Sequence, residues 1–356
     1  MIFQTVEATV GFAELNGRIK AKLRGWCLEQ ALVAGRAREV EDGEGAGFAD
    51  FCMQIGRVLY DFGQYEQALE YHGKALKIRL ATLGEEHLDT ANTLIGMAHA
   101  YICQGQYDKA LEYHGKALTI SLATMGEAHP STARTYTGMA LVYDNQGEYE
   151  QALEYYGKAL TISLATVGEA HPDTAATYNG MAGVYDSQGQ YEQALEYYGK
   201  DLKIKLATLG EAHPDTATTY NNMASVYKSQ GQYEQALEYH GKALTIYLAT
   251  LGEAHPATAI TYNNMALVYD KPGQYEQALE YYGKALTIYL ATLGEAHPYT
   301  ATTYNNMASV YDKQGQYEQA LEFYGKALQI QLATLGEAHP LTRQVQAAVG
   351  RLKAAR

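Results

Sequence analysis

Apolar residues recur along the chain at the spacing of an α-helix, first over a short stretch and then over a longer one. In the short stretch, four apolar side chains fall at positions i, i+3, i+4 and i+7, namely Tyr220, Met223, Ala224 and Tyr227. The same spacing resumes at residue 233 and continues to residue 251. Gly231 lies between the two stretches, and glycine is favoured where a helix ends in the left-handed region. The pattern therefore predicts a helix, a tight turn and a second helix.

This helix pair belongs to a block of 42 residues that occurs seven times from Asp50 to Thr342 without a change of length. A turn glycine marks each copy, at Gly63, Gly105, Gly147, Gly189, Gly231, Gly273 and Gly315. A fixed period of this size is typical of stacked repeats, in which each unit packs on its neighbours and no single central core forms. The sequence therefore predicts an all-α fold that offers an extended binding surface and no catalytic cleft.

A histidine recurs in the loop that closes each copy, and in six of the seven copies a proline follows it. These histidines are His87, His129, His171, His213, His255, His297 and His339. Packed helices lie ~9–10 Å apart, so histidines in neighbouring copies are too far from each other to share one metal ion with ligands at ~2 Å. We interpret them as helix-capping and loop-packing residues, and we expect no metal site.

The block resembles the tetratricopeptide repeat. The matching places hold Tyr220, Met223-Ala224, Tyr227, Gly231-x-Tyr233, Ala236, His240, Ala243 and Pro256. The unit is about eight residues longer than the usual one of ~34. With its Leu-Gly-x-x-His-Pro ending and its Asn-Asn-Met-Ala, it is similar to the long variant of kinesin light chains. The resemblance covers about five-sixths of the chain. It implies a right-handed α-solenoid (superhelix) of seven helix-turn-helix units with atypical helical ends.

The two ends of the chain depart from the repeat. Residues 1–44 are predicted to form an amphipathic helix and a Gly-rich link, with apolar positions at Phe12, Leu15, Ile19, Leu23 and Trp26. Seven repeat units are expected over residues 45–340, and a closing helix over residues 341–356. Because the end units of a solenoid must cover an exposed apolar face, we interpret both ends as caps.

Charge and composition narrow the class of function. The formal net charge of −13 argues against nucleic-acid partners, which need a basic face. Three widely spaced cysteines indicate neither a disulfide framework nor a thiolate zinc site. No stretch predicts a membrane span or a secretory leader, so we expect no membrane insertion and a cytoplasmic location. No catalytic motif is present, and residues 43–47 fit a linker better than a phosphate loop; we expect no enzyme activity and no cofactor.

Seven glycines stand in the middle of the second helices, where each costs ~0.8–1 kcal/mol relative to alanine. They are Gly73, Gly115, Gly157, Gly199, Gly241, Gly283 and Gly325. A close contact at this surface is one interpretation, and inheritance from one ancestral copy is the other, which we favour. Near-identical copies are not independent observations, so the differences between copies carry more information than their sameness.

One such difference lies just before the Met-Ala pair of the first helix. Glycine stands there in the second to fourth copies, at Gly96, Gly138 and Gly180, and asparagine in the last three, at Asn222, Asn264 and Asn306. The family resemblance implies that first helices line a concave groove and that this position hydrogen-bonds the backbone of an extended peptide. An asparagine amide offers both a donor and an acceptor for such a bond. We therefore predict a peptide site at these residues, supported by Asn221, Asn263, Asn305 and Asn179; solvated asparagines are the alternative.

Charged residues near the ends of the first helices form a predicted groove rim of mixed sign, which is either a peptide contact or solvated surface. They are Lys228, Asp270, Lys271, Asp312 and Lys313. Some tetratricopeptide domains use a lysine four residues before the groove asparagine to clamp a carboxylate. The corresponding positions hold Ala176, Thr218, Ile260 and Thr302, and only Arg134 is basic. We therefore expect no clamp of that kind.

Three functions fit these observations. The first is an adaptor or scaffold that binds a protein or peptide of unknown identity in the groove. The second is a kinesin light chain-like cargo adaptor with kinesin heavy chain as a partner. That family carries a long coiled coil before its repeats, whereas glycines interrupt the first 45 residues here. The third is the sensing arm of a larger signalling protein. Self-association would instead favour structural assembly.

Overall fold

The computed structural model describes residues 45–354 except residues 62 and 272, and this part of the chain consists of helices and turns with no strand. The first helices of the copies are α2 (Ala46–Asp61), α4 (Leu88–Cys103), α6 (Pro130–Gln146), α8 (Pro172–Ser187), α10 (Pro214–Ser229), α12 (Pro256–Asp270) and α14 (Pro298–Lys313). The second helices are α3 (Tyr65–Thr82), α5 (Tyr107–Met125), α7 (Tyr149–Thr166), α9 (Tyr191–Thr208), α11 (Tyr233–Thr250), α13 (Tyr275–Thr292) and α15 (Tyr317–Thr334). The last described helix is α16 (Pro340–Ala354). Consecutive helix pairs confirm the predicted all-α solenoid architecture.

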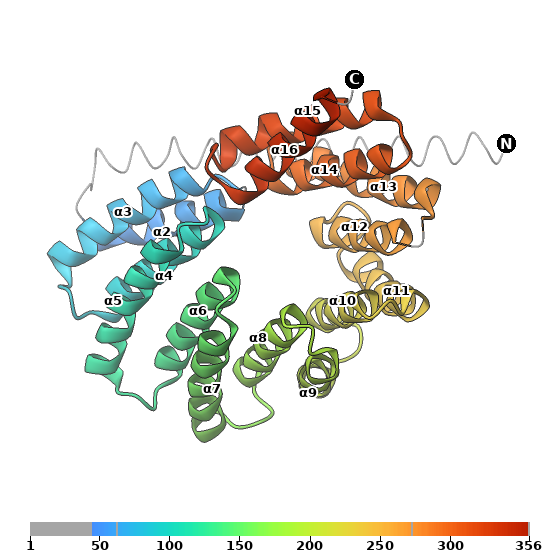
Figure 1. The fold of residues 1–356 in the computed structure, drawn as a ribbon. Helices are drawn as coiled ribbons and strands as arrows, with labels where there is room; N and C mark the ends of the chain where they lie inside the picture. The colour runs from blue at the N-terminus through green and yellow to red at the C-terminus, as the bar shows by residue number, and fades with distance from the viewer. Residues whose placement is uncertain (1–44, 62, 272, 355–356) are drawn as a thin grey trace. The chain divides into compact units, whose positions relative to one another are not determined.

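The helices fall into two compact units, which are described one at a time: residues 45–211 hold α2–α9, and residues 212–354 hold α10–α16. Within each unit every first helix packs most extensively on its own second helix, and that helix packs on the next first helix (Figure 1). First helices of adjacent copies also touch each other, as α12 and α14 do. The helix predicted near the N-terminus lies outside the described residues.

The loop histidines cap the helices that follow them. The Nδ1 atom of each accepts the backbone N–H two residues further on, at 3.1 to 3.2 Å, which confirms the capping interpretation. The turn glycines have φ between +70° and +79°, and no other residue type has positive φ in the described chain. Glycine reaches this region without the steric cost of a Cβ, so the tight turn between paired helices depends on it.

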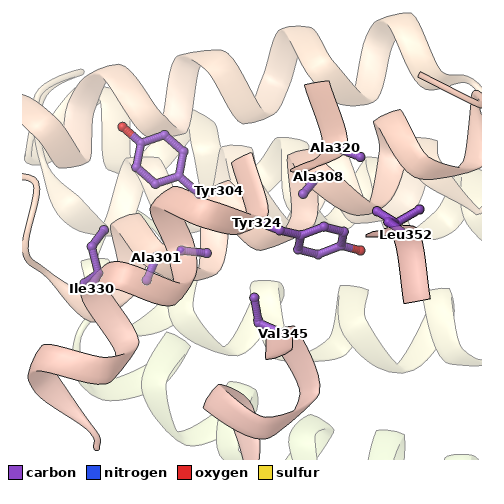
Figure 2. Packing of buried hydrophobic residues seen from close by; sticks show 9 residues of the cluster. Ala301, Tyr304, Ala308, Ala320, Tyr324, Ile330, Val345 and Leu352 are labelled. Atoms are coloured by element: carbon purple, nitrogen blue, oxygen red, sulfur yellow. The ribbon is translucent and has the colours of Figure 1, made fainter. Parts of the chain in front are cut away.

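Alanines fill the places where paired helices come closest. Ala224 of α10, together with Ala236 and Ala243 of α11, is completely buried at 0% exposure. Since protein interiors are close-packed, a larger side chain at these places would force the helices apart. At the end of the second unit, Val345 and Leu352 of α16 pack against Tyr324 of α15 and its neighbours (Figure 2).

The glycines in the middle of the second helices have open space beside them. A Cβ built at any of the seven would have no atom within 4 Å apart from its chain neighbours and the nearby backbone of its own helix. No close approach within the chain therefore requires glycine at these positions, which favours inheritance from an ancestral copy over a packing constraint.

A candidate peptide-binding face on the first helices

The predicted groove asparagines occupy equivalent positions on three first helices of residues 212–354. Asn222 on α10, Asn264 on α12 and Asn306 on α14 are all half-buried. The Nδ2 of Asn306 lies 3.5 Å from the Oδ1 of Asn263, at the outer limit of a hydrogen bond. In the described part of the chain, the side chain of Asn264 makes no hydrogen bond. Its amide donor and acceptor are therefore available to a ligand.

Asn221, predicted as a supporting residue, is a buried structural residue with 6% exposure. Its Nδ2 donates to Thr261 Oγ1 at 2.8 Å, and its Oδ1 lies 2.7 Å from the Nδ1 of His240. Because Oδ1 only accepts, His240 must carry its proton on Nδ1. Burial, together with the nearby charge of Lys228, lowers the pKa of His240 to about 3, so the ring is neutral near pH 7. Asn221 thus ties α10 to α11 and α12.

The remaining supporting asparagines differ from one another. The Oδ1 of Asn263 accepts a long hydrogen bond from Thr303 Oγ1 at 3.4 Å, which links α12 to α14. Asn305 is half-buried and its side chain makes no hydrogen bond within the described residues. Asn179 belongs to the other unit, where its Nδ2 donates to the Oδ2 of Asp201 at 3.0 Å. Among these three, Asn305 has the amide group least engaged by the protein itself.

Both predicted rim acids form ion pairs that connect helices of neighbouring copies. Asp270 at the end of α12 pairs with Lys313 at the end of α14, and Asp312 of α14 pairs with Arg351 of α16. Asp270 is only 9% exposed, so its carboxylate faces Lys313 more than solvent. Lys271 is exposed. The rim acids therefore join neighbouring helices, and the exposed cations are the part of the rim that a ligand can reach.

The glycines at the groove position of earlier copies have a packing reason that sequence reasoning missed. A Cβ at Gly138 would lie 2.4 Å from the ring of His114, and one at Gly180 would lie 2.4 Å from the ring of Tyr156. Each ring belongs to the second helix of the preceding copy and is buried. Glycine at these two places therefore makes room for a ring, in addition to leaving the position without a polar side chain.

Second-helix residues that reach the first helices were also missed from the sequence. Tyr247 of α11 lies with its hydroxyl 2.8 Å from Thr218 Oγ1 of α10. At the equivalent position of the first copy, Arg79 of α3 donates to Asp50 and Thr93. The signal was present, because this position holds five residue types in the seven copies while the isoleucine before it and the leucine after it are constant.

The face assembled from α10, α12 and α14 offers amides, hydroxyls and a few cations. Such groups can hydrogen-bond a peptide backbone. Among the described residues, no group of three or more His, Cys, Asp or Glu side chains is arranged to hold a metal ion. Nor does any described helix have the length and apolar character needed to cross a membrane.

Several solved structures are similar to this chain. Aspartyl phosphate phosphatase F from Bacillus subtilis aligns with 16% identity and a TM-score of 0.60 over 84% of this chain and 74% of that one. BtubC (BKLC) from P. vanneervenii aligns with 23% identity and a TM-score of 0.49 over 67% and 92% of the two chains. A putative kinesin light chain from Podosopora anserina, with nearly identical TPR-like repeats, aligns with 25% identity and a TM-score of 0.47 over 58% and 97%.

No curated protein matches the chain. The family model for the tetratricopeptide repeat matches residues 51–123, 89–165, 131–207, 215–291, 273–333 and 299–356. These matches cover most of the chain and agree with the repeat spacing, the turn glycines and the packed helix pairs. The chain belongs to the tetratricopeptide repeat family.

Proposed function

We propose that the protein is a non-enzymatic adaptor that binds an extended peptide along the first helices α10, α12 and α14. Asn264 and Asn306, with Asn222, would hydrogen-bond the peptide backbone, and Asn305 would add a further amide. Lys271, which is exposed, would contact an acidic side chain of the peptide. Binding partner proteins is the general role of this family, and the peptide and its site are the specific part of the proposal.

The positions at which the copies differ support this proposal. In the last five copies, three positions of the first helix carry several residue types. The second of these positions lies seven residues after the first, and the third lies four residues after the second. They are Arg134, Ala176, Thr218, Ile260 and Thr302; then Leu141, Gly183, Ser225, Leu267 and Ser309; then Asn145, Ser187, Ser229, Lys271 and Lys313. This spacing keeps the varied positions on one helical face, next to the asparagines. The second-helix stretch Tyr-Glu-Gln-Ala-Leu-Glu is identical in the same five copies.

Three varied positions on one face, beside a second-helix stretch that is identical in the same copies, support the idea that this face has been adapted to a ligand. By contrast, the exposed second-helix positions 235, 277 and 319 keep one residue type, glutamine. The varied residues are mainly hydroxyl, amide, small aliphatic and lysine side chains. That mixture suits a peptide recognised through its backbone and a few side chains.

The test is a peptide selected by phage display on the whole chain, followed by affinity measurements on variants. Replacing Asn222, Asn264 and Asn306 with Ala removes about 1 kcal/mol of hydrogen bonding each, so the Kd should rise roughly a hundredfold. The matched control replaces Gln235, Gln277 and Gln319, exposed amides on second helices, and should leave the Kd unchanged. Equal affinity for the asparagine variant and the wild type would refute the proposal.

Two alternatives remain as outcomes of a pull-down from cell extract. Specific recovery of kinesin heavy chain would support a kinesin light chain-like cargo adaptor. Recovery of a signalling enzyme whose activity changes when the chain binds would support a sensing arm. The described structure gives no contact that favours either alternative over the general adaptor.

A further inference from the structure

A groove of about 470 Å³ opens between α3 and α5 in residues 45–211. Apolar side chains line it, chiefly Leu76, Leu80, Leu94 and Ile120. Glu85, Glu86 and Lys116 also line it, and all three are exposed. Ligand sites in proteins are commonly concave and mostly apolar with a few polar groups, and ~300–1,000 Å³ in volume. This groove has those properties and lies on other helices than the peptide-binding face proposed above.

The groove exists because the second copy carries leucine where later copies carry tyrosine. Leu94 corresponds to Tyr136, Tyr178, Tyr220, Tyr262 and Tyr304. In the third copy the ring of Tyr136 packs against Leu118 of α5 and Tyr155 of α7, with ring centroids of the two tyrosines 5.9 Å apart. The tyrosine ring thus fills the space between two neighbouring second helices. Leu94 has no ring, and the equivalent space between α3 and α5 stays open.

The missing tyrosine also leaves a carboxylate without its usual neighbour. Burial raises the pKa of Tyr178, and the negative charge of Glu169 raises it further, so this hydroxyl lies in the field of that carboxylate. Glu85 is the counterpart of Glu169 in the first copy, and Leu94 stands at the position equivalent to Tyr178. Glu86 adds a second negative charge at a position that is alanine in the other six copies.

These charges are not compensated from within the described chain. Neither Glu85 nor Glu86 takes part in an ion pair there. Lys116 is held by Glu112, with Nζ to Oε1 at 2.6 Å, and lies over the ring of Tyr113. The hydroxyl of Thr90 donates to the Gly84 carbonyl. The groove therefore combines an empty place for a ring with a local excess of negative charge.

We propose that this groove binds a partner peptide that inserts one aromatic side chain between α3 and α5 and places an adjacent Lys or Arg beside Glu85 and Glu86. The aromatic ring takes the space that tyrosine takes in later copies, against Leu76 and Ile120. The cation supplies the charge that the two carboxylates lack. An acidic peptide would be repelled at the same place.

The experiment is a methyl NMR titration of the whole chain labelled at Ile and Leu, with the capped tripeptide Arg-Tyr-Arg as the probe. The methyl signals of Ile120 and Leu94 should shift and saturate. Arg-Ala-Arg, which lacks the ring, and Glu-Tyr-Glu, which reverses the charge, should each bind at least tenfold more weakly. Absence of shifts at Ile120 and Leu94 with Arg-Tyr-Arg would overturn the proposal.

Two variants distinguish binding in this groove from a general electrostatic attraction of the cationic probe to an acidic protein. Leu94→Tyr installs the residue of five other copies and should remove the Ile120 shift. Glu86→Ala, again the residue of the other copies, should weaken binding about threefold, whereas the matched control Glu169→Ala should not. If Leu94→Tyr binds the probe as the wild type does, the groove is not the site.

A second copy of the chain is the competing occupant, and sedimentation velocity distinguishes it. The proposal expects the same sedimentation coefficient for wild type and Leu94→Tyr in the absence of peptide. A wild-type dimer that becomes a monomer in the variant would assign the groove to self-association and overturn the proposal.

Discussion

The buried ion pair of Asp201 and Lys205 allows a quantitative test of how one buried charge affects the stability of the fold. Asp201 stands where every other copy has alanine, and it is completely buried, at 0% exposure. Its Oδ2 accepts from Lys205 Nζ at 2.9 Å and from Asn179 Nδ2 at 3.0 Å. Removing one partner of a buried ion pair costs ~3–5 kcal/mol, because the remaining charge stays in a medium that solvates it poorly.

Lys205→Ser, which installs the residue found at Ser121 and Ser163, should therefore destabilise the fold by ~3–5 kcal/mol. The double change of Asp201 to Ala and Lys205 to Ser recreates the combination present in the second and third copies. It removes the buried charge altogether and should be neutral or stabilising. The two effects are non-additive because the residues touch.

Urea unfolding followed by far-UV circular dichroism measures both differences, with hydrogen exchange of the α9 amides as a local readout. The expected order of stability is the double variant, then wild type, then Lys205→Ser. If Lys205→Ser and wild type had equal stability, or if the double variant were as unstable as the single one, the buried pair would not have the energetic role deduced from its burial and distances.

Three further predictions concern the backbone and pH. Gly157→Ala should stabilise the fold by ~0.8–1 kcal/mol in urea unfolding, since a Cβ there meets no atom within 4 Å beyond its chain neighbours and its own helix backbone. Gly147→Ala, at φ +78°, should destabilise the fold. Gly180→Ala should lower the thermal midpoint, because its Cβ would lie 2.4 Å from the Tyr156 ring; an unchanged midpoint would show that the ring moves freely. The buried histidines His72, His114 and His240 have pKa values of about 3 to 4, so near pH 5 they take up protons only on unfolding. The free energy of unfolding should therefore fall as the pH drops below ~6.5, by about 2 kcal/mol per histidine at pH 5. A free energy of unfolding that stays constant from pH 7 to 5 would contradict this.

Features set by local chemistry could be predicted from the sequence. The turn glycines require positive φ wherever paired helices meet, and the loop histidines lie two residues before the N–H groups that they cap. Both relations involve residues close together in the chain. The helical spacing of apolar residues and the fixed period then lead to packed helix pairs without further information.

Features that depend on partners distant along the chain could not be predicted. Asn221 and Asn222 are neighbours of the same type, yet Asn221 is buried because His240 and Thr261, 19 and 40 residues away, take up its amide. Likewise, the sequence shows that Leu94 replaces a tyrosine, but only the packed helices show that the tyrosine ring fills a groove. The candidate site was therefore predicted at the level of the helix face and not at the level of each side chain.

The central claim is that the first-helix face of α10, α12 and α14 binds the peptide, and the asparagine side chains can report this directly. In a sample labelled with ¹⁵N-asparagine, the side-chain amide signals of Asn264, Asn305 and Asn306 should shift on titration with the selected peptide, while that of the buried Asn221 should shift less. Saturating peptide that leaves the signals of Asn264 and Asn306 unchanged would contradict the account.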